Sequence, residues 1–422
     1  MKVSDVVKGA KNNPYFLTSI YLYFNFFIHG VGVIAISQNM GNLVTHYGTD
    51  EAGVMYVLSG MGLGRFLSYF ASSFFAERLK RKSIILGGIG LYILFFVGVL
   101  LSPSIGIAFC FAVLGGVANA CLDVGTYPAL MDAYPKSPGT AVIFCKATVS
   151  LGQMFYPLFV GYLIVQGVWF GYSLIFPAVL LALNAFLISL SRFADPKKMP
   201  AEDIKHLPVQ KRKPHPVLDG GTVILFGFAI YATFHTALIW LPQYVEAATS
   251  TSKVISLRTI SFYSIGSLLG VFLTGGLVSR WLRTVAVLTV FPVIAASAAL
   301  FIYFFPTIII CNVGAFVIGF TAAGGILQLG LSVVSEYFPD NKAKITGIYM
   351  LFGSLANFLV PLITAKINAV DTRYIMLFDA SLALMAAVLG FIIFLRYYRI
   401  FTIQPSDIRL GERYCIRKIS GS

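Results

Sequence analysis

The sequence has few charged residues: Asp, Glu, Lys and Arg make up 11% of its 422 residues, against about 25% in an average soluble domain. A soluble protein of this length has more surface than so few charges can cover. A water-soluble enzyme, a disordered protein and a nucleic-acid-binding protein are therefore excluded as first interpretations. Apolar residues make up 58% of the chain. This composition is typical of a polytopic membrane protein.

Acidic residues are scarcer than basic ones, 17 against 31, which gives a formal net charge of +14. The basic residues lie between long apolar runs, where determinants of membrane topology occur, so they do not indicate nucleic-acid binding. The 5 cysteines are scattered and include no Cys-x-x-Cys pair. They indicate neither a disulfide framework nor a zinc site, and we expect no metal and no cofactor.

Twelve apolar segments are long enough to cross a bilayer, which takes about 20 helical residues. The links between them are short except for 192–216, which is rich in basic residues and proline. The sequence therefore predicts an all-α integral membrane protein with two six-helix halves, 1–191 and 217–395. A cytoplasmic basic linker at 192–216 joins them, and a cytoplasmic basic tail follows at 396–422. The predicted spans are 15–43, 52–76, 84–101, 105–131, 140–165, 169–191, 217–245, 258–280, 284–304, 308–337, 344–367 and 374–395.

The distribution of Lys and Arg predicts the orientation of the chain in the membrane. With the N-terminus inside, 25 of the 31 basic residues fall in cytoplasmic segments. Outer links contain four, and two lie within spans. This positive-inside bias predicts that both termini are cytoplasmic.

An internal repeat relates the two halves. A shift of 204 residues aligns the fourth and fifth spans with the tenth and eleventh without a gap. Such a repeat predicts two similar halves related by an axis along the membrane normal, with alternating access and a solute site at their interface near the bilayer midplane. The matched pairs include Gly115–Gly319, Pro135–Pro339, Pro157–Pro361, Asp132–Glu336 and Gln153–Asn357.

Twelve spans, a basic middle loop and a repeat of six plus six resemble the major facilitator superfamily. That family has a signature after its second helix, Gly-x-x-x-Asp-Arg/Lys-x-Gly-Arg/Lys-Arg/Lys, and residues 73–82 here read SFFAERLKRK. The acid and three bases match, whereas Ser73, Glu77 and Lys80 replace the glycines and the aspartate. The resemblance implies that this loop binds an acid at the inner end of helix 4; the alternative is that these are topology charges only. The implied cytoplasmic gate consists of Glu77, Arg78, Arg81 and Asp132, with Glu336 as the analogue in the second half.

Six segments carry a closer resemblance: HGVGVIAISQNM (29–40), GMGLGR (60–65), NACLDVGTYPALM (119–131), KATVSLGQMFYP (146–157), GGILQLG (324–330) and NFLVPLIT (357–364). Through them, nearly the whole chain resembles the YdiN/YdiM-like inner-membrane transporters of bacteria. This resemblance implies a plasma-membrane transporter, with an association to hydroaromatic acids such as quinate or shikimate. Many proton-coupled exporters of the superfamily have an Arg four residues before a Gly on helix 4, where this chain has Phe111 before Gly115. That departure weakens, but does not exclude, a multidrug exporter.

Three of the charged residues within the predicted spans are candidates for a function, because a charge costs about 2.5–3.5 kcal/mol at the helix centre. Arg65 keeps its proton and needs an anion, which could be a substrate carboxylate or Asp123. Asp123 and Lys146 lie at similar depths on the fourth and fifth spans. A buried Asp123–Lys146 pair is the simplest arrangement, and such a pair could carry a proton when it breaks. A static pair is the alternative.

Polar neutral groups also lie near the middle of the spans. Two histidines separated by 206 residues suit proton coupling, and four amides can both donate to and accept from a hydroxyl-rich solute. Each could instead be a hydrogen-bonded packing residue. Trp240 could line the outer vestibule or belong to the aromatic belt. The predicted substrate-binding residues are Arg65, His29, Asn119, Gln153, His235, Gln328, Asn357 and Trp240.

These observations predict a secondary transporter that moves a small polar organic solute and couples its transport to protons. The solute that they favour is a hydroxylated or hydroaromatic carboxylate. We expect a monomer in a bacterial inner membrane, with the solute, the proton and the lipid bilayer as partners and no nucleic acid. A proton-driven multidrug exporter and a non-transporting sensor are the alternatives. An enzyme lacks support, because Gly60-x-Gly62-x-Gly64 lies within a predicted helix and indicates helix packing, not a dinucleotide loop.

Overall fold

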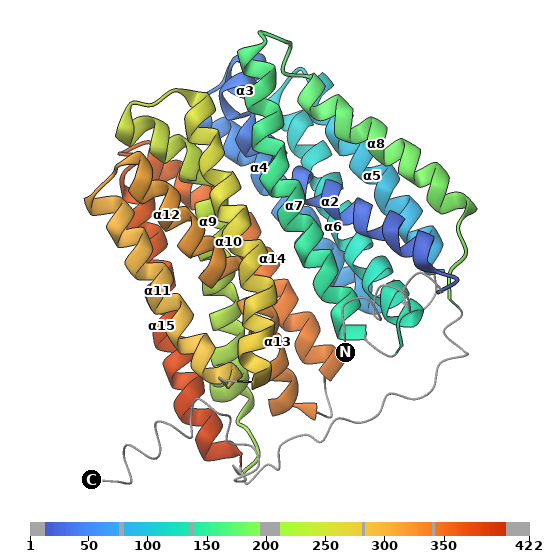
Figure 1. Cartoon of the computed structure of the whole chain (residues 1–422), viewed down its shortest axis with the longest axis vertical. Coiled ribbons are helices and arrows are strands. Elements are labelled where there is room, and N and C mark those ends of the chain that lie inside the picture. The colour runs from blue at the N-terminus through green and yellow to red at the C-terminus, as the bar shows by residue number, and fades with distance from the viewer. Residues whose placement is uncertain are drawn as a thin grey trace. The chain divides into compact units, whose positions relative to one another are not determined.

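A computed structural model describes residues 13–75, 80–135, 138–194, 212–280, 283–339 and 342–401 (Figure 1). The chain divides into two compact units, Met1–Glu202 and Asp203–Ser422, and each is considered by itself. Most of the predicted linker and tail lies outside the described residues, as do Glu77 and Arg78 of the predicted gate.

Unit 1 is built from helices. Its elements are α2 (Phe16–Gln38), α3 (Met40–Tyr47), α4 (Glu51–Phe75), α5 (Arg81–Leu101), α6 (Ile105–Ala133), α7 (Pro138–Val165) and α8 (Tyr172–Leu190).

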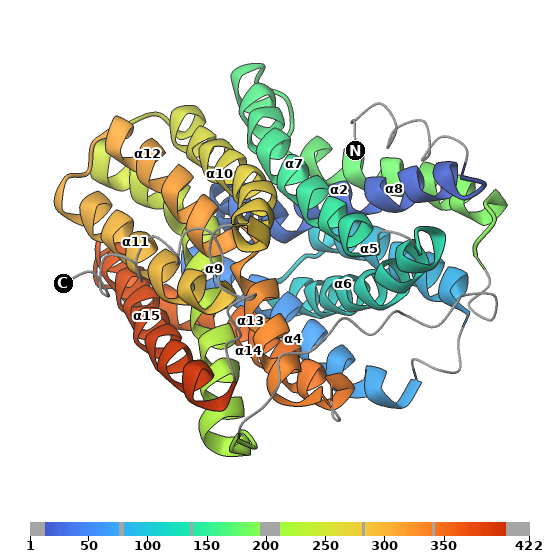
Figure 2. The ribbon, with the colours of Figure 1, turned by 60° about the horizontal axis from the view of Figure 1, so that its bottom comes forward.

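Unit 2 is helical as well, and its helices α11 and α15 run side by side (Figures 1 and 2). Its elements are η2 (Pro216–Gly220), α9 (Gly221–Thr249), α10 (Lys253–Arg280), α11 (Thr284–Phe304), α12 (Ile308–Ile318), η3 (Gly319–Ala323), α13 (Ile326–Tyr337), α14 (Lys342–Asn368) and α15 (Tyr374–Ile400).

The predicted fold class is confirmed. Among the described residues, 11 helical stretches are long and apolar enough to cross a membrane. The helix α4 has 25 residues and corresponds to the remaining predicted span. The helices begin and end within a few residues of most predicted boundaries, because long apolar runs and the polar links between them mark helix ends directly.

Two predicted spans are interrupted. The first breaks at Asn39, whose side chain donates to the Tyr156 hydroxyl at 2.9 Å and accepts from Ser173 at 3.1 Å. The tenth contains the wide turn η3, followed by Gly325 with φ of 95°. Only glycine adopts that backbone conformation without strain. The hydropathy of a whole span does not reveal such breaks, since each segment is apolar on average.

Close contacts between helices depend on glycine in both units. A Cβ at Gly64 would lie 2.0 Å from the carbonyl oxygen of Val113, so α4 and α6 pack backbone to backbone. In unit 2, a Cβ at Gly266 would lie 2.0 Å from the Phe316 oxygen, which brings α10 against α12 in the same way. Small residues at helix contacts are the main way for membrane helices to pack closely. The interpretation of the Gly60–Gly64 run as helix packing is confirmed.

Candidate functional site

A charged cluster lies inside unit 1. The Arg65 guanidinium donates from Nη2 to Asp123 Oδ2 at 2.7 Å, and the Tyr69 hydroxyl donates to the same oxygen at 2.7 Å. Arg65 Nη2 also donates to the Tyr69 oxygen at 3.2 Å. The side chains of Arg65 and Asp123 are only 16% and 7% exposed. Of the two anions that the sequence leaves open for Arg65, this structure shows Asp123.

The local sequence explains why these groups meet. Arg65 and Tyr69 are four residues apart on α4, so they share one helix face. A Cβ at Gly116 of α6 would lie 2.7 Å from the backbone nitrogen of Arg65, so the two helices touch at this level. Asp123 follows Gly116 by about two helical turns and lies on the same face. Glycine packing therefore holds an acid and a base against each other.

Two further titratable groups surround this pair. Lys146, on α7, interacts electrostatically with both Asp123 and Arg65. His29, on α2, lies within electrostatic range of the same three side chains. The carboxylate of Asp123 is hydrogen-bonded by Arg65 and Tyr69, and the pair of Asp123 with Lys146 that the sequence suggests stays a prediction.

The polar groups next to the pair leave hydrogen-bonding capacity open. His29 is 5% exposed and stacks on Phe26 with ring centroids 5.4 Å apart. The Tyr92 hydroxyl hydrogen-bonds to the side chain of Asn119. Among the described residues, His29 Nδ1 and Asn119 Oδ1 are buried and have no hydrogen-bond partner. A buried polar atom without a partner costs about 1–3 kcal/mol, so these atoms suit a polar ligand that binds and leaves.

Gln153 lies where α2 and α7 meet. It is 5% exposed. A Cβ at the preceding Gly152 would lie 2.0 Å from the Phe27 oxygen, and one at Gly30 would lie 2.2 Å from the Val149 oxygen. The backbones thus touch beside both His29 and Gln153. This contact brings α2 and α7 to the side of the cluster formed by α4 and α6.

In unit 2, the predicted residues lie in different surroundings. His235 is 2% exposed, and its ring lies 5.8 Å from that of Tyr231. Asn357 is buried on α14, while Gln328 is exposed on α13. Trp240 is fully buried, and its Nε1 donates to the Thr364 hydroxyl at 2.7 Å. That contact joins α9 to α14 and places the indole inside unit 2, not in an aromatic belt.

The described part of the predicted gate contains two separate contacts. In unit 1, Arg81 forms an ion pair with Asp132 and donates from Nη1 to the Pro128 oxygen at 2.9 Å. In unit 2, Glu336 accepts a bond from the Tyr397 hydroxyl at 2.9 Å. The pairing that the superfamily resemblance implies for helix 4 is thus present in the first unit.

Several polar groups were missed by sequence reasoning. Asp219 is fully buried and binds Arg396 at 2.6 Å and 3.0 Å, through two nitrogens. The predicted last span ended one residue before Arg396, which hid this pair. Tyr69 could have been found, because it follows Arg65 by one helical turn. Asp379 could also have been found, as an acid within the twelfth span.

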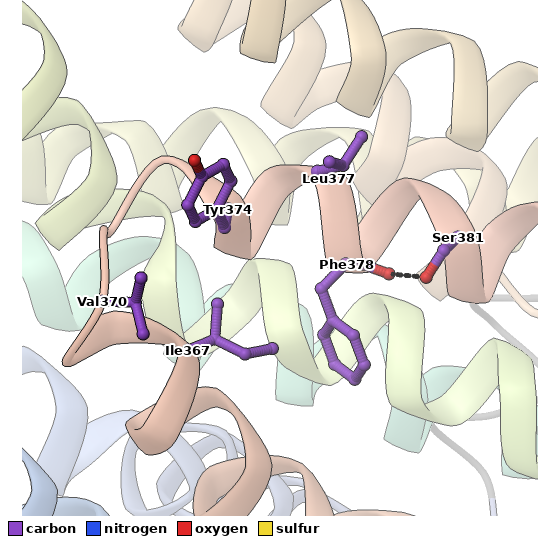
Figure 3. A pocket seen from close by; sticks show the side chains of 6 residues that line it. All are labelled: Ile367, Val370, Tyr374, Leu377, Phe378 and Ser381. Atoms are coloured by element: carbon purple, nitrogen blue, oxygen red, sulfur yellow. Dashed lines mark hydrogen bonds between the residues drawn. The ribbon is translucent and has the colours of Figure 1, made fainter.

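A cavity of about 450 Å³ lies between the end of α14 and the start of α15 (Figure 3). Its lining is almost entirely apolar, and the Ser381 hydroxyl donates to the Phe378 oxygen at 2.7 Å. It contains no charged side chain, so it does not fit a carboxylate. The lining residues are Ile367, Val370, Tyr374, Leu377, Phe378 and Ser381.

Comparison with known proteins identifies the family. The profile of the Major Facilitator Superfamily matches residues 22–361 and 259–401. The chain belongs to the Major Facilitator Superfamily. It is 42% identical over 409 residues to the inner membrane transport protein YdiN of Escherichia coli K12, covering 97% of each chain. It is 38% identical over 390 residues to YdiM of the same organism, covering 91% of this chain and 95% of that one.

Solved structures show the same fold. A D-xylose–proton symporter matches with a TM-score of 0.71 at 15% identity, over 94% of this chain and 100% of that one. A bacterial homologue of the human lysosomal transporter Spinster matches with a TM-score of 0.70 at 16% identity, over 94% and 99%. Its membership of the Major Facilitator Superfamily and its similarity to inner membrane transport proteins make the chain a membrane transporter and not an enzyme.

Proposed function

We propose that the protein carries a small polar organic solute, a hydroxylated or hydroaromatic carboxylate, across the plasma membrane by alternating access coupled to protons. The observation that supports this most is the buried Arg65–Asp123 pair, with its 2.7 Å bond and only 16% and 7% exposure. An Arg that cannot lose its proton is the best side chain for binding a carboxylate inside a membrane protein.

The pair suggests how solute and proton are coupled. A solute carboxylate that binds Arg65 displaces Asp123, which then lies buried beside a second carboxylate and has lost the Arg that was hydrogen-bonded to it. Such a group takes up a proton, because charge without a partner is costly there. When the solute leaves, Arg65 binds Asp123 again and the proton is released. One carboxylate and one proton thus move together at this site.

The atoms around the pair fit the rest of the solute. His29 Nδ1 and Asn119 Oδ1 lie in the same unit and lack partners among the described residues. Nδ1 can accept from a hydroxyl in one tautomer of the histidine, and the amide oxygen accepts in any case. A ring or chain that has hydroxyls next to a carboxylate offers such donors. Gln153 supplies a further amide beside them.

The test is transport by the purified protein in liposomes that contain a pH-sensitive dye. Hydroaromatic acids, sugar acids and uncharged polyols are added one class at a time. We expect internal acidification with a carboxylate class only, and its loss in Arg65→Gln and Asp123→Asn. Matched controls are Arg373→Gln and Asp371→Asn, since both side chains are exposed.

Two other outcomes would contradict the proposal. Normal acidification by Arg65→Gln and Asp123→Asn would refute the assignment of solute and proton to this pair. Exchange of cationic dyes for protons, with no response to any solute of the panel, would favour the multidrug exporter instead.

A further inference from the structure

Asp379 is a fully buried acid in α15, with 0% of its surface exposed. Neither of its carboxyl oxygens has a hydrogen-bond partner among the described residues. The buried acids Asp123 and Asp219 each bind an Arg instead. Asp379 therefore needs an explanation that an ion pair does not supply.

Its surroundings favour the neutral form of the carboxyl. The buried face of α15 around it consists of apolar residues, including Ile375, Met376 and Ala383. An ionised group there would pay a desolvation cost of several kcal/mol without any compensating bond. A neutral carboxyl pays only about 1–3 kcal/mol for its unmade hydrogen bonds. Burial without a partner therefore favours a carboxyl that keeps its proton.

One nearby hydroxyl could donate a hydrogen bond to Asp379 if the carboxyl were ionised. The Tyr263 hydroxyl, on α10, interacts electrostatically with Asp379. Its single proton is donated to the Phe234 oxygen of α9 at 3.1 Å, so it is not available to the carboxyl here. A rotation of that O–H toward Asp379 would give a newly formed carboxylate a donor. Tyr263 thus links the state of Asp379 to the α9–α10 contact.

The other titratable groups around Asp379 supply no fixed positive charge. From α9, Tyr231 packs in the same apolar cluster as Leu382 of α15, and the ring of His235 lies tilted against that of Tyr231. Neither α9 nor α11 contains a Lys or Arg, and the one titratable side chain of α11 is Tyr303. The basic side chains near the start of α10 and the end of α14 are Lys253, Arg258 and Lys366. Arg258 and Lys366 are exposed.

We propose that Asp379 is a proton-binding site of unit 2, which releases its proton when water reaches the carboxyl and so adds a second coupled proton to that of Asp123. This rests on the proton coupling proposed above. Asp379 lies five residues into α15, about 8 Å along the axis from the helix start. A small helix movement would expose it. If Asp379 stayed neutral throughout the transport cycle, its unmade hydrogen bonds would lower the stability of the protein without serving a function.

The first arm of the test detects the proton directly and needs no transport. Infrared spectra of the purified protein at neutral pH are compared for wild type, Asp379→Asn and the exposed-site control Asp371→Asn. We expect a protonated-carboxyl C=O band in the wild type and the control, and its loss in Asp379→Asn. A band that persists in Asp379→Asn would overturn the proposal. Tyr263→Phe keeps the band and checks it in a second variant, should Asp379→Asn fail to fold.

The second arm measures the number of protons moved per solute in liposomes. Asp379→Asn should lower this ratio about twofold, while exchange of solute across the membrane continues. An unchanged ratio with the infrared band lost would make Asp379 a static neutral acid and overturn its role in coupling. If wild-type protein moves no solute, the proposed function fails, and the infrared arm still decides whether Asp379 binds a proton.

Discussion

The Arg65–Asp123 pair makes a prediction about stability that does not depend on the identity of the solute. In Arg65→Gln the buried Asp123 loses the Arg that binds it. In Asp123→Asn the buried Arg65 loses the carboxylate that neutralises it. Breaking a buried pair costs about 3–5 kcal/mol. The 16% exposure of Arg65 and the Tyr69 bond that remains to Asp123 reduce this cost, and we expect about 2 kcal/mol for each single variant.

The double variant Arg65→Gln/Asp123→Asn should recover most of that loss. Removing both charges also removes both desolvation costs, and neutral replacements for a buried ion pair are often nearly neutral in stability. We expect the double variant to lie about 1 kcal/mol below wild type, which gives an interaction energy of about 3 kcal/mol in the double-mutant cycle.

The assay is the free energy of unfolding in mixed detergent micelles, with SDS as the denaturant. The matched cycle uses the exposed residues Asp371 and Arg373, where the backbone nitrogen of Arg373 donates to the Asp371 carboxylate. There we expect changes within about 0.5 kcal/mol and no interaction energy. If the loss in the Arg65/Asp123 double variant equalled the sum of the single losses, the two charges would not be coupled and the argument would be refuted.

The packing contacts give two further predictions. Gly64→Ala should destabilise the protein by about 1–3 kcal/mol, because its Cβ would overlap the Val113 oxygen; Gly87→Ala, where nothing lies within 4 Å, is the control, and equal unfolding free energies would contradict the α4–α6 contact. Thr364→Val should cost about 1 kcal/mol, because it leaves the buried indole N–H of Trp240 without an acceptor. Transport should persist in Thr364→Val, and loss of transport with stability unchanged would instead assign Trp240 to the solute path.

The sequence predicted best the features that depend only on the length and apolar character of a segment. A helix that crosses lipid must satisfy its backbone internally and cover about 30 Å, so apolar length predicts each span closely. The boundaries of α11, Thr284–Phe304, agree with the predicted span 284–304. The break at Asn39 and the wide turn η3 were missed, because they come from hydrogen bonds and a glycine conformation that hydropathy does not record.

The candidate site was predicted in part. Sequence reasoning found Arg65, Asp123, Lys146 and His29 as costly groups within apolar spans, and the structure brings these four into one cluster. Sequence reasoning passed over Tyr69, a neutral residue whose hydroxyl is useful only once Arg65 and Asp123 lie beside it. The amides of unit 2 stay proposals, since their roles depend on a solute.

By itself, the sequence determined that this is a membrane protein and which apolar segments are long enough to cross a bilayer, because transfer free energies depend on residue type and segment length. Only the tertiary structure decided that Asp123 binds Arg65 and Tyr69, and that Asp379 is left without a partner. Those outcomes depend on helix rotation and on approach distances of a few ångströms. Glycines such as Gly64 and Gly116 set these distances, and a hydropathy pattern contains no information about them.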